Sequence, residues 1–94
     1  MGLFNLFKRD RVDPELKRRM LLKQFGRITE GTILEAGHDP TAEFVSFVYS
    51  VNGADYESSD KLTTEQSSDG ARYAPGAKVT VRYDPAQPGN SIII

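Results

Sequence analysis

The fold of this chain is decided by one stretch, Tyr73-Ala-Pro-Gly-Ala-Lys-Val-Thr-Val-Arg-Tyr-Asp-Pro-Ala-Gln-Pro88. Pro75-Gly76 is a turn dipeptide, because proline presets φ at the second turn position and glycine accepts a positive φ at the third. From Lys78 to Asp84, polar and apolar residues alternate, which is the period of a strand with one buried face. Pro85 ends this strand because proline has no N–H to donate to a ladder. The stretch is a structural signature, and it contains no catalytic chemistry.

Two more strands are predicted as a hairpin. Residues 43–51 and 54–59 alternate in the same way, and Asn52-Gly53 between them is the strongest short-range signal for a hairpin turn. Because a two-residue turn fixes the register, we expect Tyr49 to face Tyr56 across the pair. One face of the hairpin carries most of the apolar residues and is therefore the predicted core face. It consists of Val45, Phe47, Tyr49, Val51 and Tyr56.

The remaining strands are predicted at the two ends of this region. Residues 27–36 are rich in β-branched residues and predict the first strand, with Gly31 at a bulge or sharp bend. Ser91–Ile94 predicts the last strand, which is apolar on both faces and should lie between other elements rather than at an open edge. Residues 60–72 are polar and predict a mobile loop. His38, the one histidine, is expected in a solvated loop.

Five short antiparallel strands in a chain of 94 residues predict a small closed or half-closed barrel, SH3-like or OB-like. The predicted fold class is therefore mainly β with an N-terminal α-helix. The barrel would close if the last strand paired with the first. We divide the chain into a basic N-terminal arm and helix, residues 1–26, and a small β-barrel domain, residues 27–94.

The start of the N-terminal helix is predicted by Asp13-Pro14-Glu15. Asp13 suits the N-cap, proline suits the first helical position, and an acid in the first turn faces the positive end of the helix dipole. The helix is expected to run from Pro14 to Phe25, with Gly26 as its C-terminal glycine. Its apolar residues spread over more than half of the circumference, and the ordinary explanation is a helix that plugs or flanks the barrel.

Charge is distributed unevenly along the chain. Residues 1–27 hold eight basic and three acidic residues, a net charge of +5, whereas residues 28–94 hold four basic and ten acidic residues, a net charge of −6. Such asymmetry indicates an anionic partner for the basic part. It is equally compatible with a basic arm that folds back on its own acidic domain.

The first residues, 1–12, combine an apolar stripe with a basic cluster, which is the composition of a helix that lies in a membrane interface. Burial of the apolar side chains and attraction to an anionic leaflet would favour binding, but ordering the arm costs conformational entropy. The balance predicts weak and reversible attachment. The candidate contacts with a membrane or a partner are Leu3, Phe4, Leu6, Phe7, Lys8, Arg9, Arg11, Lys17, Arg18 and Arg19. Alternatively, the arm frays, docks on the domain or pairs with a second copy in a homo-oligomer.

Three motifs in this chain resemble a widespread bacterial family of domains of unknown function. They are Tyr73-x-Pro-Gly-x-x-Val-x-Val-x-Tyr-Asp-Pro-x-x-Pro88, Gly31-Thr-Ile33 and Tyr49-x-Val-x-Gly-x-x-Tyr56. The resemblance implies a small β domain of the kind that members carry beside transmembrane helices, and it implies no activity. This chain differs from that pattern, because its apolar runs are far shorter than the roughly 20 residues that cross a bilayer.

Composition narrows the classes of function. The chain has no cysteine and one histidine, so catalysis would depend on carboxylates, and no pair of them has a convincing context. We therefore expect no enzyme, no cofactor and no metal.

The leading hypothesis is a non-catalytic binding or scaffolding domain, cytoplasmic or membrane-peripheral, whose partner is an unknown protein or an anionic membrane surface. The alternative is a nucleic-acid-binding small barrel. The acidic barrel argues against it, as does the lack of interleaved aromatic residues around Lys17, Arg18 and Arg19.

Overall fold

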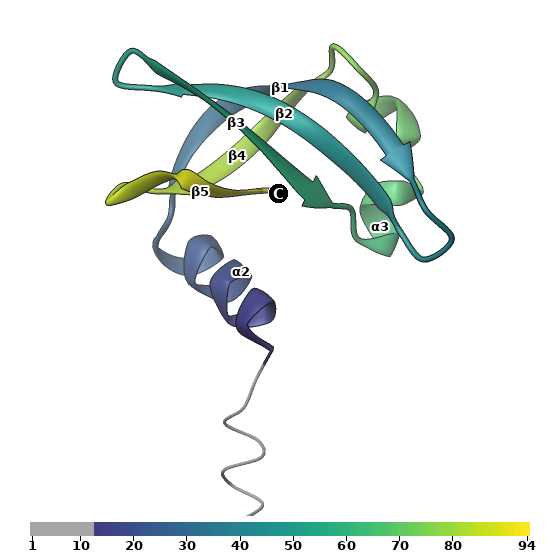
Figure 1. Ribbon diagram of the computed structural model, residues 1–94, viewed down its shortest axis with the longest axis horizontal. Helices are drawn as coiled ribbons and strands as arrows, with labels where there is room; N and C mark the ends of the chain where they lie inside the picture. The colour runs from purple at the N-terminus through teal and green to yellow at the C-terminus, as the bar shows by residue number, and fades with distance from the viewer. Residues whose placement is uncertain (1–12) are drawn as a thin grey trace, which may run out of the picture.

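The computed structural model describes residues 13–94, so the candidate contacts at residues 3–11 lie outside the described part of the chain. The described part begins with helix α2, Pro14–Phe25 (Figure 1), as predicted. The Asp13 side chain accepts a hydrogen bond from the backbone N–H of Glu15, at 3.0 Å. At the other end, the N–H of Gly26 donates to the carbonyl oxygen of Leu22 at 2.8 Å, so both predicted ends of the helix are confirmed.

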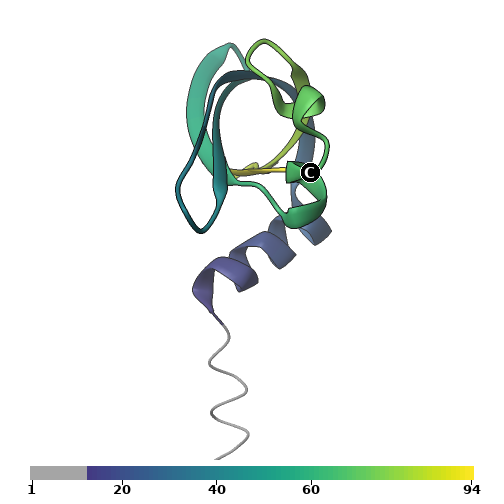
Figure 2. The same cartoon turned by 90° about the vertical axis from the view of Figure 1, so that its right-hand side faces the viewer.

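Five strands follow and form a single antiparallel sheet in the order β3-β2-β1-β4-β5. Their bounds are β1 Arg27–His38, β2 Glu43–Val51, β3 Ala54–Lys61, β4 Lys78–Asp84 and β5 Gln87–Ile93. The sheet curls until β3 approaches β5, and Figure 2 shows the nearly closed barrel that results. The predicted five-stranded barrel with an N-terminal helix is confirmed.

The barrel does not close by pairing of the last strand with the first, the condition that the sequence left open. The last strand, β5, pairs with β4 and not with β1, because the turn after Asp84 returns the chain directly beside β4. The Asp84 side chain stabilises this turn by accepting a hydrogen bond from the N–H of Ala86 at 2.8 Å. β5 is the last strand of the ladder, but Ser91, Ile92 and Ile93 are buried and the strand lies between β4 and β3, so the expectation that it lies between other elements is confirmed. The strand begins earlier than predicted, at Gln87.

The long strand β1 lies at the centre of the sheet and pairs with both β2 and β4. A register shift occurs between Ile33 and Glu35, so the predicted irregularity lies near Leu34 rather than at Gly31. Gly31 is needed for a different reason: a Cβ there would lie 2.7 Å from Cγ2 of Val81. β1 runs on to His38, which is exposed in the strand rather than in the predicted loop.

The predicted loop at residues 60–72 is also more structured than expected. β3 extends to Lys61, and two short helices follow, α3 at Thr64–Ser67 and a 3₁₀ turn, η1, at Gly70–Tyr73. Side-chain capping explains α3, because Thr63 and Gln66 each accept a hydrogen bond from the backbone N–H of the other. The polar composition of this segment therefore reflects capped turns rather than a mobile loop.

The core fills the inside of the barrel and contains the predicted face of the hairpin. The buried cluster consists of Ile33, Val45, Phe47, Tyr49, Val51, Leu62, Tyr73, Val79, Val81 and Ile93. Tyr49 pairs with Tyr56 in register, as predicted, and their stacked rings have centroids 5.7 Å apart. The Tyr49 hydroxyl donates to the carbonyl oxygen of Pro88 at 2.5 Å, which connects β2 to β5.

Candidate functional site: the outward face of helix α2

Helix α2 is attached to the barrel mainly through polar contacts. Its one buried residue is Leu22. Nη1 of Arg18 donates to Oδ1 of Asn90 at 2.8 Å and to the carbonyl oxygen of Ser91 at 3.1 Å. The same guanidinium binds both carboxylate oxygens of Glu15, at 2.7 and 2.8 Å. This hydrogen bonding holds the pKa of Glu15 below its ordinary value and raises the pKa of Arg18.

Arg19 binds the barrel at the seam between β3 and β5. Its Nη1 lies 2.6 Å from Oδ1 of Asp60, a residue that is only 6% exposed. Oδ1 of Asp60 also accepts from the N–H of Lys61, at 2.9 Å, and Oδ2 accepts from the N–H of Ile93, at 3.0 Å. Asp60 therefore accepts a hydrogen bond from the backbone of β5 and also neutralises the charge of Arg19 in α2. We call Arg18, Arg19 and Asp60 the helix latch.

The latch separates residues that the sequence placed together as candidate contacts. Arg18 and Arg19 turn toward the barrel and are partly buried, whereas Lys17 is exposed. The other predicted contacts, at residues 3–11, lie outside residues 13–94. Of the three adjacent bases in α2, only Lys17 is therefore fully presented to solvent, and the two arginines bind groups of the chain's own barrel.

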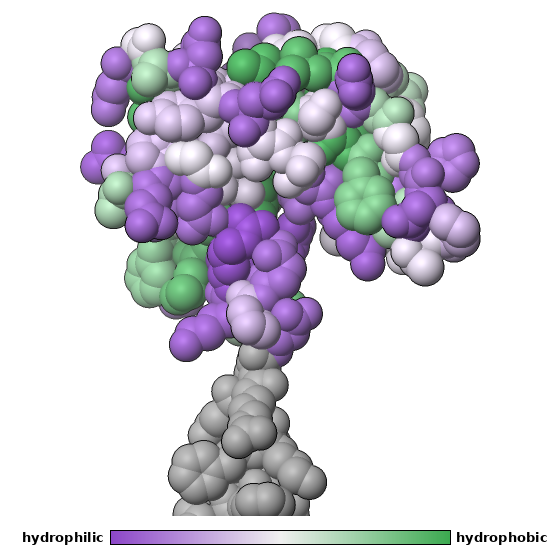
Figure 3. Space-filling view, viewed as in Figure 1, coloured by the Kyte–Doolittle hydropathy of each residue, from purple (hydrophilic) through white to green (hydrophobic). Residues whose placement is uncertain are grey.

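Helix α2 leaves several large apolar side chains exposed. Their exposed fractions, together with that of the neighbouring residue of β1, are Leu16 51%, Met20 59%, Leu21 48%, Phe25 69% and Ile28 60%. Figure 3 shows apolar side chains gathered beside the helix at the foot of the barrel. A helix usually buries its apolar stripe against the core, whereas α2 buries only Leu22 of its apolar residues.

Three basic residues, Lys17, Lys23 and Arg27, are exposed beside these apolar side chains. Within residues 13–94, every ion pair involves Arg18 or Arg19, so these three bases have no carboxylate partner there. We call the set Leu16, Lys17, Met20, Leu21, Lys23, Phe25, Arg27 and Ile28 the outward face. The sequence did not predict the apolar residues of this face as a site, because a helix with a broad apolar surface usually packs against the core.

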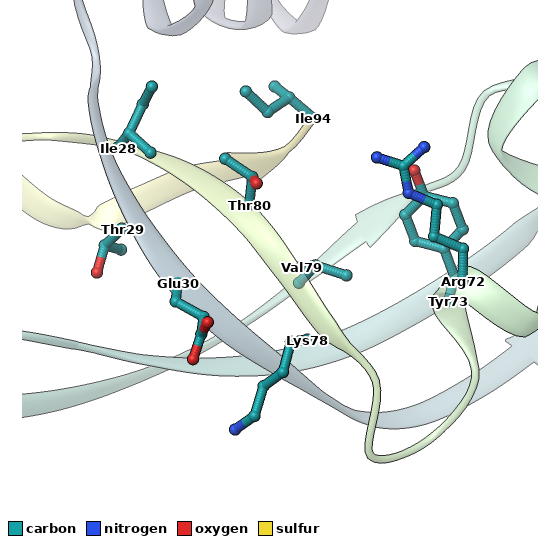
Figure 4. Close-up of a pocket in the computed structure, with 9 residues that line it drawn as sticks. All are labelled: Ile28, Thr29, Glu30, Arg72, Tyr73, Lys78, Val79, Thr80 and Ile94. Atoms are coloured by element: carbon teal, nitrogen blue, oxygen red, sulfur yellow. The ribbon is translucent and has the colours of Figure 1, made fainter.

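A concave region of about 370 Å³ lies between Arg19 and Lys23 of α2 and the segment of α3 and η1, where Glu65 and Asp69 also line it. Two other concave regions lie nearby. The first, about 310 Å³, lies on the outer side of β1 and β4 against η1 (Figure 4). It is of mixed polarity: Ile28 and Ile94 lie at one end and Glu30 and Lys78 at the other, with the Arg72 guanidinium 5.9 Å from the centre of the Tyr73 ring. This arrangement places no nucleophile beside a base.

The second of these two regions is a groove of about 270 Å³ between α2 and the turn that joins β4 to β5. It is lined mainly by apolar atoms, and it continues from Leu21 and Phe25 of the outward face to Pro85. Across residues 13–94, no cluster of histidine and acidic side chains is arranged to hold a metal ion. In the same range, no helix has the length and apolar composition to cross a bilayer.

Fold and site together define a small antiparallel barrel with a latched N-terminal helix that leaves large apolar side chains exposed. Residues 26–94 match the family described as a domain of unknown function, DUF3592, and the chain belongs to that family. The resemblance to a family of unknown function is thus confirmed. No curated protein and no solved structure matches the chain.

Proposed function

We propose that this chain is a non-catalytic binding or scaffolding domain that attaches peripherally to a membrane through its basic N-terminal part. The orientation of α2 carries the proposal. Its arginines are used to bind the barrel, and its apolar side chains are left outside. Contiguous apolar surface rimmed by polar residues marks interaction sites in soluble proteins. The barrel then serves as the rigid support for α2.

Charge supports a membrane as the partner. The first 27 residues carry a net charge of +5 and the remainder carries −6, so the basic and acidic parts of the molecule are segregated. A basic residue close to an anionic leaflet contributes about 1 kcal/mol of attraction. Three exposed bases on the outward face, with apolar side chains between them, suit weak and reversible attachment.

The contacts of the buried carboxylate and the position of the histidine support a non-catalytic role. Asp60, the buried carboxylate, accepts hydrogen bonds from Arg19, Lys61 and Ile93, and so it is occupied in stabilising the fold. His38 is exposed at the end of β1. His38 lines a hollow with Asp39, Glu43 and Lys61, but within residues 13–94 no hydrogen bond or ion pair joins its ring to any of them.

The nucleic-acid alternative has less support than the membrane proposal. Phosphate binding requires a basic surface, and two of the three adjacent bases of α2 already bind Glu15, Asp60 and Ser91. The net charge of −6 on residues 28–94 would repel a nucleic acid.

Sedimentation with vesicles tests the proposed function. The full chain should pellet with vesicles that contain phosphatidylserine, pellet much less with pure phosphatidylcholine, and be released by salt. Removal of residues 1–12 should weaken this binding, with circular dichroism as the check on folding. If the full chain stays in the supernatant with both vesicles, the membrane role is wrong. Binding to oligonucleotides that is lost on adding salt would favour the alternative.

A further inference from the structure

We infer that the outward face of α2 is itself a lipid-contact surface, on which the helix lies parallel to an anionic bilayer while the latch holds the barrel on the solvent side. This inference rests on the proposed function and adds a contact surface to it, because none of the apolar residues involved belongs to residues 1–12. It also assigns a role to five exposed apolar residues that the fold leaves without one.

The positions of the apolar residues define a surface along one side of the helix. Leu16 and Met20 form one i, i+4 pair, and Leu21 and Phe25 form another, so each pair follows the helix axis. Ile28, at the start of β1, is also exposed, and it lines the same concave region as Ile94. Leu16 and Met20 lie roughly opposite Leu22 and the latch arginines on the helical wheel. Phe25 follows Arg18 by seven residues and lies at the edge of the surface, in the groove that Arg18 and Leu22 also line. The surface is therefore accessible along the length of the helix.

The polar residues set the depth of insertion. Lys17 and Gln24 lie between the two apolar pairs on the helical wheel, so the helix cannot sink entirely into hydrocarbon. A lysine stem can lie along apolar surface while its ammonium stays at the headgroups. The expected position is therefore the boundary between headgroups and acyl chains, about 5–10 Å into the leaflet.

The charges of the outward face select an anionic surface. Lys17 is exposed between the two apolar pairs, and Lys23 and Arg27 are exposed near the C-terminal end of the helix, while the acids of α2 are already occupied. The Asp13 carboxylate caps the helix, and that of Glu15 binds Arg18. Anionic phospholipid headgroups would supply the missing countercharges of the three bases.

A second copy of the chain fits this surface less well. The 12-residue helix is about 18 Å long and about 10 Å wide, which gives a contact footprint of roughly 180 Å² per partner. Stable protein interfaces bury about 800 Å² on each partner. Two identical outward faces would also bring like charges together at Lys17, Lys23 and Arg27. A bilayer requires neither shape complementarity nor a large rigid footprint.

A tryptophan reporter tests the inference in the full chain, which contains no tryptophan of its own. Phe25→Trp should show a blue-shifted emission when vesicles containing phosphatidylserine are added. Leu34→Trp is the matched control, because Leu34 is an exposed apolar residue, 39% accessible, on β1. It lies about 23 Å of strand from Arg27 and should show no shift. Thermal unfolding by circular dichroism verifies that both variants fold.

Two further sets of variants separate α2 from the first residues. In the full chain with Leu3, Phe4, Leu6 and Phe7 all changed to serine, the shift of Phe25→Trp should persist at a higher lipid concentration. The pair Met20→Ser and Phe25→Ser should weaken vesicle binding by about tenfold or more, whereas Leu34→Ser should leave it unchanged.

The outcomes distinguish this inference from the proposed function. If the full chain pellets with anionic vesicles but Phe25→Trp shows no shift, the first residues carry the binding. The inference is then overturned and the proposed function stands. A shift that follows protein concentration without vesicles would identify a second copy as the occupant and would also overturn it. No pelleting at all would remove the proposed function, and the inference with it.

Discussion

The barrel and helix α2 are stabilised in opposite ways. The barrel buries its apolar side chains and connects its strands through a backbone ladder, with Phe47 and Val81 fully buried. Helix α2 buries only Leu22 and is attached through the latch residues Arg18 and Arg19. The difference shows that a helix bound to its domain through charged side chains can leave its apolar side chains exposed. Most of the buried apolar surface lies in the barrel, and we propose that the helix is the binding element.

The energies involved agree with this division. A fully buried large apolar side chain stabilises a fold by about 1.5–3 kcal/mol, and the barrel holds many of them whereas α2 holds one. A 12-residue helix is marginal by itself in water. The conformation of α2 therefore depends on its cap, on the latch and on whatever contacts the outward face.

The largest effect is expected from truncating a phenylalanine in each region. Phe47→Ala leaves a cavity in the core and should lower the free energy of unfolding by about 3–5 kcal/mol. Phe25→Ala removes a side chain that is 69% exposed and should change this free energy by less than about 0.5 kcal/mol. Urea unfolding of both variants measures the difference. Equal losses would mean that Phe25 packs against the barrel.

The next effect concerns the latch. Asp60→Ala leaves Arg19 and the N–H of Ile93 without their acceptor, and should lower the free energy of unfolding by about 2–3 kcal/mol. It should also speed tryptic cleavage after Lys17 and Lys23, because α2 would separate from the seam. Glu15→Gln removes an exposed partner of Arg18 and is the control, with a loss below about 1 kcal/mol. Unchanged cleavage in Asp60→Ala would contradict the latch.

A smaller loss is expected from a methyl group at the centre of the sheet. In Gly31→Ala, the new Cβ would lie 2.7 Å from Cγ2 of Val81 and 3.2 Å from the carbonyl oxygen of Val48, so the strands must shift. Overpacking of this kind costs about 1–3 kcal/mol. Gly37→Ala on the same strand meets no atom within 4 Å and should be nearly neutral. Thermal unfolding of the two variants measures the difference. A lower melting temperature for Gly31→Ala alone would show that β1 needs glycine only where it packs closely against β4.

The smallest effect depends on pH and involves Tyr49. Burial raises the pKa of its phenol, so the folded state favours the neutral form. The resulting stabilisation is present below the ordinary tyrosine pKa of about 10 and is lost as the pH rises through the higher folded-state value. Tyr49→Phe should cost about 1 kcal/mol at neutral pH, because the hydrogen bond to Pro88 is lost. It should also lose less stability than the parent chain on going to about pH 11. The midpoints of urea unfolding, measured for both proteins across this pH range, provide the test. If the two proteins lose stability equally as the pH rises, ionisation of Tyr49 makes no contribution to the pH dependence.

Local signals in the sequence were sufficient for most of the elements. Asp13 and Gly26 predicted the ends of α2, and Asn52-Gly53 predicted both the hairpin and the Tyr49–Tyr56 pair. Each of these signals depends on contacts between near neighbours in the chain. Such contacts are encoded in short stretches and can be deduced without the tertiary structure.

Long-range features could not be deduced in this way. The partners of β5 depend on how far the sheet curls, and the bond from Asp60 to Ile93 connects residues far apart in the chain. The orientation of α2 depends on the same seam, because Asp60 attracts Arg19 and thereby turns the apolar residues outward. The candidate site therefore became visible only when the ion pairs were known.

Amide hydrogen exchange of the full chain, with and without phosphatidylserine vesicles, tests most directly whether α2 is the binding element and the barrel its support. In solution, amides of residues 14–25 should exchange faster than those of β4, because few apolar contacts protect the helix. On vesicles, exchange in the helix should slow markedly while exchange in β4 stays the same. Helix amides that exchange equally fast in the free and the vesicle-bound protein would contradict the account.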